Sequence, residues 1–524
     1  MKADLFTQAD LEQMEQLGIT EDEASKQVAI LEKGPQRPHL LRPCTLGDGI
    51  VDLETVEQER LLTRWKTAAA EGRLAEFLPA SGAATRMFAF LQRIQNRLGQ
   101  VTAAKIAEGA DEKDSDYLDF KLFIGSLREF AFFEPLSKVM AKAGISLEEQ
   151  LESRDCTELL DFLLEPRGLN YGLLPKALIP FHRYSDHTRT ALEEHLVESV
   201  QTVRDAAQRC RVHFTVSPEI EAVVENHGRV AAANHAERFG VQYDLSFSVQ
   251  SPATNTLAVD LTNRPFRRLD GSLLFRPGGH GALLKNLNQY QGDIVFIKNI
   301  DNVVTDDHRD PVVFHQRMLA GMLLELQDTI FRYLRLLDSG SVGANDLQDV
   351  LDFAVQHLNV SLAEEFSRCD DKEKASRLFR LLNRPLRVCG MVINRGEPGG
   401  GPFWVKDHSG RLSVQIVENA EIDQDSPEQI SILKASTHFS PVQIVCGLRD
   451  FQGQPFNLAE FANSEAVFVT QKTENGRDLK VLELPGLWNG GMAYWNTVFV
   501  EIPEETFNPV KTINDLLRPG HRTK

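Results

Sequence analysis

The sequence predicts an α/β protein built around a mainly parallel mixed sheet. Between residues 77 and 305, short apolar runs typical of strands alternate with longer segments typical of helices. The run Ile294-Val-Phe-Ile297 is apolar throughout, as in a strand that is covered on both faces. Strands that alternate with helices favour a parallel sheet with the helices packed on it. The composition, 42% hydrophobic and 25% charged, is that of a globular protein.

The first region, residues 1–76, is expected to be helical. Thr20 and Glu23 have the spacing of a capping box, in which each side chain accepts from a backbone N–H group at the start of a helix. Apolar residues follow at positions 28–31. This pattern predicts a helix that begins directly after Thr20.

The second region, residues 77–337, is the predicted α/β core, with a helical insertion at about 100–165. Arg211–Val216 is a short run of β-branched and aromatic residues, so it predicts a strand. Ser217-Pro218 then supplies an N-cap followed by proline at the first helical position. We therefore expect a helix that begins at Pro218 and runs towards Phe239.

The core is expected to end with a long helix, because apolar residues between Met318 and Leu334 recur on one helical face. Gly340 and Gly343 then indicate a linker. The third region, residues 338–524, begins with a helical pattern and becomes rich in strand signals around residues 390–422. It is therefore predicted to be a C-terminal α+β region.

The charge balance and the cysteines exclude several classes of protein. The chain carries 57 basic and 75 acidic residues, a net charge of −18, which repels nucleic acids and anionic membranes but allows a local pocket for a small anion. No apolar run approaches the roughly 20 residues that span a bilayer. The six cysteines are scattered without zinc-type spacing. We expect a soluble, reduced, cytoplasmic protein without nucleic-acid or membrane partners.

The segment FLPASGAATRMF, residues 77–88, places small residues and an arginine where a strand is expected to turn into a helix. Small side chains let backbone N–H groups approach a phosphate, and the start of a helix adds partial positive charge. Arg86 could hold further phosphate oxygens through its planar guanidinium. An ordinary tight turn also explains the segment, so both interpretations stay open at this point.

Two further segments offer groups that could contact an anionic ligand. Lys176 follows Pro175 in a segment bounded by prolines, where an ammonium suits a point contact to phosphate; a solvated loop lysine is the alternative. His280 lies between Gly279 and Gly281, where a flexible backbone can wrap a ligand. The alternative is a glycine-rich turn with an incidental histidine.

Three carboxylates complete the candidate set. Asp301 follows the apolar strand 294–297, and ligands of parallel sheets bind beyond the carboxyl ends of strands. A carboxylate there suits a hard cation such as Mg²⁺, or else it caps the turn. Glu397, in a glycine-rich hairpin, and Glu418, at the end of a strand-like run, could accept sugar hydroxyls or simply be solvated.

One other cluster is expected to have no role in the chemistry. His182 and His187 lie near each other, but Arg183 and Arg189 accompany them. Two cations beside two histidines disfavour a metal pair, so the sequence predicts a solvated loop.

In this order the segments resemble those of sugar-1-phosphate nucleotidyltransferases, especially the UDP-sugar pyrophosphorylase branch. That family has a Gly-Gly-x-Gly-Thr-Arg loop after an apolar strand, a Pro-Lys pair, a strand that ends in glutamine, a Gly-His-Gly loop, an Asn-x-Asp-Asn turn and two later glutamates. The counterparts here are Ser81–Arg86, Pro175-Lys176, Gln250, Gly279–Gly281, Asn299–Asn302, Glu397 and Glu418. The whole chain also resembles a bacterial family described only as a domain of unknown function.

The resemblance implies a fold of the GT-A or Rossmann-like nucleotidyltransferase type, with about 385–425 completing the sugar side of the core. The implied catalytic residues are Arg86, Lys176 and Asp301, with Asp301 as the ligand of Mg²⁺. The implied nucleotide-binding residues are Ala80, Ser81, Gly82, Ala83, Thr85, Gln250, Gly279, His280 and Gly281. The implied sugar-binding residues are Asn302, Glu397 and Glu418.

The activity implied by the resemblance is that of a nucleotidyltransferase. It would join a nucleoside triphosphate, with UTP expected, to a sugar 1-phosphate and release pyrophosphate. Ser81 and Ala84 stand where the family loop has glycine, and a Cβ at such a place obstructs the approach of a phosphate. The alternative is therefore a non-catalytic nucleotide or nucleotide-sugar binding protein on the same scaffold.

Overall fold

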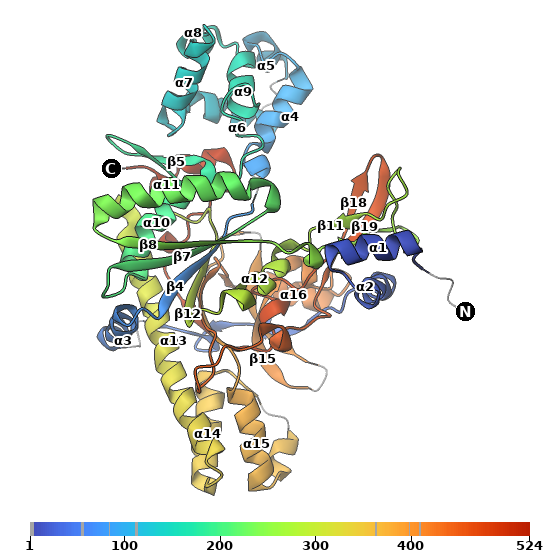
Figure 1. Ribbon diagram of the computed structural model, residues 1–524, viewed down its shortest axis with the longest axis vertical. Coiled ribbons are helices and arrows are strands. Elements are labelled where there is room, and N and C mark those ends of the chain that lie inside the picture. The colour runs from blue at the N-terminus through green and yellow to red at the C-terminus, as the bar shows by residue number, and fades with distance from the viewer. Residues whose placement is uncertain are drawn as a thin grey trace. The chain divides into compact units, whose positions relative to one another are not determined.

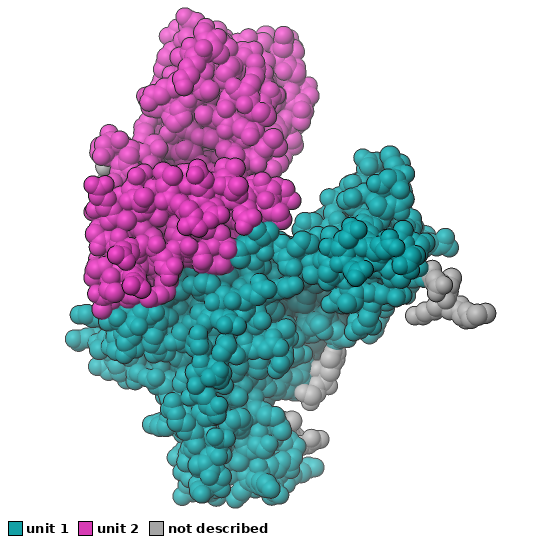
Figure 2. All heavy atoms as spheres, in the orientation of Figure 1, with its two compact units in different colours: residues 1–77, 248–297, 316–504 teal, residues 78–247, 298–315, 505–524 magenta. Residues whose placement is uncertain are grey.

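The computed structural model describes residues 5–53, 57–82, 84–109, 114–361, 364–397, 399–407 and 410–523. The chain forms two compact units, each assembled from three separate segments (Figure 2). Unit 1 comprises residues 1–77, 248–297 and 316–504, and unit 2 comprises residues 78–247, 298–315 and 505–524. The chain passes from one unit to the other within β4 (Leu74–Pro79), β8 (Gln242–Val249), β12 (Ile294–Lys298), α13 (Arg309–Asp338) and the 3₁₀ helix Glu504–Thr506.

Unit 1 contains a large sheet with the strand order β2-β3-β20-β13-β17-β12-β4. The strands not yet given are β2 (Thr45–Leu46), β3 (Gly49–Val51), β13 (Leu386–Ile393), β17 (Gln443–Gly447) and β20 (Asn496–Glu501). Strand pairs β2–β3, β3–β20, β20–β13 and β12–β4 are parallel, whereas β13–β17 is antiparallel. The prediction of an α/β fold with a mainly parallel mixed sheet is therefore confirmed.

The sheet of unit 1 carries the main hydrophobic core of that unit. Strand β12 is buried along its whole length, as the apolar run predicts. Phe77, Val295, Cys389 and Phe499 come from four strands and belong to one buried cluster. Helix α12 (Leu283–Tyr290) adds Leu283 and Leu287 to the same cluster. Apolar side chains of the strands and of this helix therefore form the core together.

The N-terminal region is only partly helical. Helices α1 (Gln8–Leu17), α2 (Glu21–Lys33) and α3 (Gln58–Ala70) are present, and Thr20 forms the predicted capping box with Glu23. However, β1 (His39–Pro43), β2 and β3 also lie in this region, so the expectation of a wholly helical segment is wrong. Strand β1 pairs with β14 (Gly400–Lys406). The two strands are so far apart in the chain that no local sequence pattern predicts their pairing.

A smaller sheet of unit 1 packs on the first two helices. It contains β10 (Val259–Asp260), β19 (Arg477–Glu483) and β18 (Phe468–Glu474), in that order. Met14 and Val28 of the helices share a buried cluster with Leu482 of β19. The C-terminal region also holds helices α14 (Ala344–His357), α15 (Asp371–Leu382) and α16 (Pro427–Lys434), and the hairpin of β14 with β15 (Leu412–Glu418). The predicted α+β character of this region is confirmed.

Unit 2 is built on β7 (Arg209–Val216) and β8, with helices α10 (Ala191–Thr202) and α11 (Glu221–Phe239) (Figure 1). Strand β7 covers the strand predicted at residues 211–216. Helix α11 ends at the predicted residue but begins at Glu221, because Pro218–Ile220 form a 3₁₀ turn and the Ser217 side chain makes no capping hydrogen bond. Helix α10 begins with a capping box between Thr190 and Glu193.

The predicted helical insertion is present in unit 2. Within the predicted bounds lie α5 (Ala103–Gly109), α6 (Ser115–Gly125), α7 (Phe133–Lys142), α8 (Leu147–Ser153) and α9 (Thr157–Leu164), and α4 (Ala89–Leu98) directly precedes them. They lie together as a group in Figure 1. Aromatic rings stabilise the group: the centroids of Phe130 and Phe132 are 5.0 Å apart, and both rings contact Phe123. None of the six cysteines, all of which lie in the described residues, forms a disulfide, and none of the described helices is long and apolar enough to cross a membrane.

Candidate functional site

Three segments of unit 2 that are far apart in the sequence meet at the side chain of Lys176. Its ammonium donates to the Asp301 carboxylate, with Nζ and Oδ2 2.5 Å apart, and to the main-chain carbonyl of Val510 at 2.6 Å. Both charged side chains are shielded from solvent, with 13% of Lys176 and 17% of Asp301 exposed. Two of the three predicted catalytic residues are therefore in direct contact.

The loop that follows β4 lies against the segment that carries Lys176. The Gly82 carbonyl accepts from the Lys176 N–H group at 3.1 Å, and the Ala84 N–H group donates to the Leu174 carbonyl at 3.0 Å. The buried Ala80 donates its N–H to the Thr215 carbonyl at 2.8 Å. Ala83 lies outside the described residues. Backbone hydrogen bonds on both sides of Ala83 thus hold this loop beside Lys176.

The surface of the loop is open at Gly82. Apart from its neighbours in the chain, no heavy atom of the described residues lies within 4 Å of a Cβ built at Gly82, and the φ angle of Gly82 lies outside the left-handed region. Neither packing nor backbone conformation therefore requires glycine there. Ser81 is half-buried, whereas Thr85 and Arg86 are exposed. Arg86 forms no ion pair within the described part of the chain, so its guanidinium is available to an anion.

Asp301 lies in a tight turn at the carboxyl end of β12. The Asn302 N–H group donates to the Asn299 carbonyl at 3.1 Å, which closes the turn. The Asn302 side chain is buried, and its Oδ1 accepts from the Asn508 N–H group at 2.8 Å. Its Nδ2 group has no hydrogen-bond partner among the described residues. A buried amide donor of this kind is usually satisfied by a water or a ligand oxygen.

The last residues of the chain complete this site, which sequence patterns did not predict. Within unit 2, the Val510 N–H group donates to the Asp301 carbonyl at 3.2 Å, and the Ile513 N–H group donates to the Met87 carbonyl at 3.0 Å. The segment around Val510 therefore contacts the loop after β4, Lys176 and the Asp301 turn. A main-chain carbonyl can belong to any residue type, so no sequence signal identifies Val510.

The oxygens around Lys176 are suited to a hard cation. Asp301 supplies a carboxylate and Val510 a carbonyl, the ligand types that Mg²⁺ accepts together with waters and substrate phosphates. The described residues contain no group of three or more His, Cys, Asp or Glu side chains that could hold a metal alone. A magnesium ion at Asp301 would therefore depend on the Val510 carbonyl, water or a bound phosphate for its remaining ligands.

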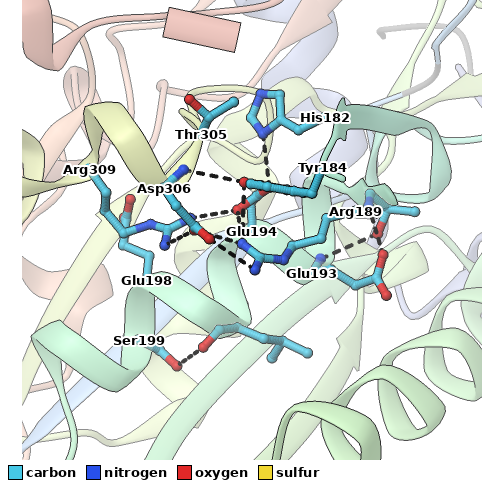
Figure 3. Close-up of polar contacts among 12 residues, drawn as sticks. His182, Tyr184, Arg189, Glu193, Glu194, Glu198, Ser199, Thr305, Asp306 and Arg309 are labelled. Carbon is cyan, nitrogen blue, oxygen red and sulfur yellow. Dashed lines mark hydrogen bonds and ion pairs between the residues drawn. The ribbon is translucent and has the colours of Figure 1, made fainter. Parts of the chain in front are cut away.

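A largely buried network of charged side chains includes Asp306 and Arg309, which follow the Asp301 turn in the chain (Figure 3). At its centre the Glu194 carboxylate accepts from His182 at 2.9 Å, from the Tyr184 hydroxyl at 2.7 Å and from Arg309 at 2.6 Å. Arg189 donates to Glu194 at 3.3 Å. The side chains of these contacts come from three places: α10, the hairpin of β5 (Pro180–Arg183) and β6 (Thr188–Thr190), and the chain after β12.

The expectation of a solvated loop around His182 and Arg189 is wrong. Their exposed fractions are 0% and 1%. Arg189 donates two hydrogen bonds to Asp306, at 2.7 and 3.1 Å, across 117 residues of sequence. His182 also contacts His521, with Nε2 and Nδ1 2.9 Å apart. The charges are buried because partners from distant segments neutralise them, which local sequence cannot reveal.

The network keeps its carboxylates ionised. Burial alone would raise the pKa of Glu194, but the hydrogen bond and charge of His182, with the charges of Arg309 and Arg189, lower it to about 2. Partial burial would also raise the pKa of Asp306, whose side chain is 43% exposed, but Arg189 and Arg309 lower that pKa to about 2. At neutral pH both groups therefore carry full negative charge against the two arginines.

Helix α10 also holds the end of β12. The Nε2 group of His195 donates to the Ile300 carbonyl at 3.2 Å. The carboxylate of Glu198 accepts two contacts from the Lys298 ammonium, at 2.7 and 2.8 Å, and both side chains are buried. Residues 298–309 are thus fixed along one side by α10. We conclude that α10 positions the turn on which Asp301 lies.

We expect acid to weaken the fold through His195. Burial, and then the positive charge of Lys298, lower the pKa of His195 from 6.5 to about 4. Below pH 6.5 the unfolded chain therefore binds a proton that the folded chain excludes, so stability falls as the pH falls towards 4. This group alone should remove about 2 kcal/mol of unfolding free energy between pH 7 and pH 5.

The measurement is denaturant unfolding at both pH values. His195→Gln keeps an N–H donor for the Ile300 carbonyl but does not titrate, so it should lose less stability on acidification than the wild type. The exposed His39 supplies the control: His39→Gln should retain the wild-type pH dependence. Equal pH dependence in wild type and His195→Gln would contradict the assigned role of His195.

The other predicted nucleotide-binding residues belong to unit 1. The Nε2 group of Gln250 is buried without a hydrogen-bond partner among the described residues, so it suits a ligand acceptor. Gly281 has a packing role, because a Cβ there would lie 2.3 Å from the Pro485 carbonyl oxygen, whereas Gly279 has a φ angle of +72°, in the left-handed region that favours glycine. The fold therefore requires glycine at positions 279 and 281, whether or not a ligand binds there.

His280 and Glu418 are neighbours in unit 1. The His280 Nδ1 atom accepts from the Leu487 N–H group at 3.1 Å, so its Nε2 carries the proton. That Nε2 lies 3.6 Å from Glu418 Oε1. The imidazole stacks on Trp488, with ring centroids 4.3 Å apart. The structure thus joins one predicted nucleotide-binding residue with one predicted sugar-binding residue.

Glu421 is a polar residue of unit 1 that the sequence did not single out. Burial raises the pKa of Glu421 to about 7, although its hydrogen bonds with the Glu418 N–H group and the Asn489 amide oppose this shift. Glu421 and Asn489 line a pocket of about 330 Å³. Glu397 lines a different pocket of about 230 Å³. The capping-box spacing of Glu418 and Glu421 is the signal that could have identified Glu421.

Comparisons with known proteins give a family and several similar folds. A family model described as a domain of unknown function (DUF4301) matches residues 7–522. No curated protein matches the sequence. A mutant UDP-glucose pyrophosphorylase from Leishmania major, in complex with UDP-glucose, is 12% identical with a TM-score of 0.43, over 97% of this chain and 78% of that chain.

Two structures from Trypanosoma brucei are similar to a comparable degree. The uridine diphosphate N-acetylglucosamine pyrophosphorylase, in complex with an inhibitor, is 12% identical with a TM-score of 0.45, over 98% of this chain and 79% of that chain. The UDP-glucose phosphorylase is 13% identical with a TM-score of 0.45, over 97% of this chain and 77% of that chain.

Proposed function

Because the chain belongs to the DUF4301 family, whose description assigns no activity, we propose its function from its own residues: it is a nucleotidyltransferase that joins a nucleoside triphosphate, with UTP expected, to a sugar 1-phosphate. The observation that carries this proposal is the contact of Lys176 with Asp301 beside the open loop at Gly82. These are the residue types, in one place, that the transfer of a nucleotidyl group between two polyanions needs.

The reaction is a substitution at phosphorus. An oxygen of the sugar phosphate forms a bond to the α-phosphorus, the bond from that phosphorus to the bridging oxygen of the β-phosphate breaks, and pyrophosphate leaves with the electron pair. The attacking phosphate is already anionic near neutral pH, so no general base is required. Catalysis then depends on positioning the two anions and on neutralising their charge.

Each of the grouped residues of unit 2 has a role in this proposal. Backbone around Gly82 would approach the triphosphate, and the exposed Arg86 would bind its outer oxygens. Lys176 would contact the phosphate of the acceptor. Asp301 would hold Mg²⁺, which supplies positive charge at the phosphate oxygens when it is bound. The Nδ2 group of Asn302, buried without a partner among the described residues, would donate to a substrate oxygen.

One observation favours a second candidate, a non-catalytic nucleotide or nucleotide-sugar binding protein. The buried Ala84 stands at a glycine position of the resembled loop, and its N–H group is already donated to the Leu174 carbonyl. That group cannot serve a phosphate at the same time. A loop with fewer free donors would hold a triphosphate less firmly than the loop of an efficient enzyme.

Product analysis tests the proposed reaction. The purified protein is incubated with Mg²⁺, each of five nucleoside triphosphates and a panel of sugar 1-phosphates, and mass spectrometry is used to detect nucleotide-sugars and pyrophosphate. We expect one triphosphate, UTP, to give a nucleotide-sugar. If no combination gives product while a finished nucleotide-sugar raises the melting temperature, the binding protein is the correct candidate.

The variant Gly82→Ala shows whether the ligand binds at the predicted loop. Because the added methyl group meets no described atom within 4 Å other than those of its chain neighbours, the variant should keep the wild-type melting temperature without ligand. It should lose most of the thermal shift that a nucleoside triphosphate produces, since the methyl group occupies the open surface of the loop. A full nucleotide-dependent shift in Gly82→Ala would place the phosphates elsewhere.

A further inference from the structure

The Lys176 ammonium lies where a cation would be expected between two oxygens. It contacts Asp301 Oδ2 at 2.5 Å and the Val510 carbonyl oxygen at 2.6 Å. These two atoms are here called the Asp301–Val510 oxygen pair. A carboxylate and a main-chain carbonyl are ligands for a divalent cation as well as for an ammonium group. Lys176 and such a cation therefore compete for the same atoms.

The oxygen pair is held in place by contacts that do not involve Lys176. The Val510 N–H group donates to the Asp301 carbonyl, and the Asn508 N–H group donates to Asn302 Oδ1, so two hydrogen bonds join the two chain segments. The Asp301 turn is closed by its own hydrogen bond from Asn302 to Asn299. Removal of the ammonium would therefore leave the two oxygens near each other.

Lys176 can leave the oxygen pair without unfolding its own segment. Its backbone is fixed in the short 3₁₀ helix 176–178 and by the hydrogen bond from its N–H group to the Gly82 carbonyl. Only the flexible four-carbon side chain has to move. Because the backbone of Lys176 lies beside the loop at Gly82, a released ammonium remains near the proposed phosphate site.

The charges make it unfavourable for the Lys176 ammonium and a divalent cation to occupy the Asp301–Val510 oxygen pair together. Asp301 is the one carboxylate with which Lys176 forms an ion pair in the described part of the chain. A single negative charge balances the ammonium, but it cannot balance an ammonium and a divalent cation placed a few ångströms apart. The bound metal would therefore repel the ammonium towards the nearest anion, which is the substrate phosphate under the function proposed above.

We propose that the Asp301–Val510 oxygen pair is a cation site that Lys176 fills in the free protein and leaves when a divalent cation binds. The consequence of this exchange rests on the proposed function. Under that function, Lys176 becomes available to the acceptor phosphate only after the metal is in place. Val510 then acts through its carbonyl as a second oxygen ligand. The exchange itself can be measured without any substrate.

The test is the affinity of the full-length protein for Mn²⁺, measured by electron paramagnetic resonance of the free ion, without nucleotide. Lys176→Ala should bind Mn²⁺ about tenfold more tightly than the wild type, because the site no longer has to be vacated. Lys176→Gln, which fills the space without a charge, should also bind more tightly and remains informative if Lys176→Ala folds poorly. Lys142→Ala removes an exposed lysine of α7 and should match the wild type.

Asp301→Asn identifies the site. This variant should lose the measured Mn²⁺ binding, and the double variant Lys176→Ala with Asp301→Asn should lose the gain seen in Lys176→Ala. Mn²⁺ affinities of Lys176→Ala and Lys176→Gln that equal or fall below the wild-type affinity would overturn the proposal. A gain that persists in the double variant would also overturn it, because the metal would then bind elsewhere.

The outcome is separate from that of the proposed function. Tighter Mn²⁺ binding in Lys176→Ala, together with no product in the substrate screen, would retain the cation exchange and reject the transferase. Product formation together with unchanged Mn²⁺ affinity would retain the transferase and reject the exchange.

Discussion

Asp301→Asn is expected to reduce pyrophosphate release by a factor on the order of 10² or more, because the substitution removes the negative charge that would hold the metal. The amide has nearly the size of the carboxylate and can still accept a hydrogen bond from Lys176, so the fold should be retained. Lys176→Ala should cause a similar loss, since it removes positive charge from the acceptor side. The measurement is the initial rate of pyrophosphate release with the substrate pair found in the screen.

A matched control separates the site from general effects of charge. Asp310 is exposed, lies nine positions after Asp301 in unit 2, and forms no ion pair with any residue that the structure describes. Asp310→Asn should therefore keep the wild-type rate. Wild-type turnover in both Asp301→Asn and Lys176→Ala would exclude the proposed chemistry at this site.

Glu194→Gln is expected to be the most destabilising of the substitutions considered. The carboxylate contacts Arg189 and Arg309 (Figure 3) and balances their charge. Both arginine side chains are nearly inaccessible to solvent. Removing one partner of such a buried group leaves positive charge without compensation, which typically costs about 3–5 kcal/mol. The unfolding free energy, measured by denaturant titration near neutral pH, should fall by about that amount. Because the network holds residues 298–309, residual folded protein should also lose activity.

The neighbouring Glu193 provides a conservative comparison. Its carboxylate caps α10 through Thr190, and glutamine can take the same place in a capping box. Glu193→Gln should therefore change the unfolding free energy by less than about 1 kcal/mol. If Glu194→Gln were as stable as Glu193→Gln, the buried charges would have to be compensated by groups other than Glu194.

Several parts of this protein could be predicted from sequence because their signals are local. The capping box at Thr20, the apolar strand β12 and the long helix α13 each depend on residues within a few turns or positions of one another. The same holds for the chemical types at Lys176 and Asp301, which were singled out by their neighbours in the chain. The resemblance implied that both residues belong to one catalytic site, but their direct contact is known only from the structure.

Tertiary structure alone decided the remainder of the site. The Val510 carbonyl has no side-chain signature, and it reaches Lys176 across 334 residues of sequence. The polar residues His182 and Arg189 were expected in solvent but are buried, because Glu194 and Asp306 compensate them. The free energy of a buried charge depends on partners that only the folded chain brings together. The sequence therefore determined which groups are present, whereas the fold determined which of them are paired, buried and available to a ligand.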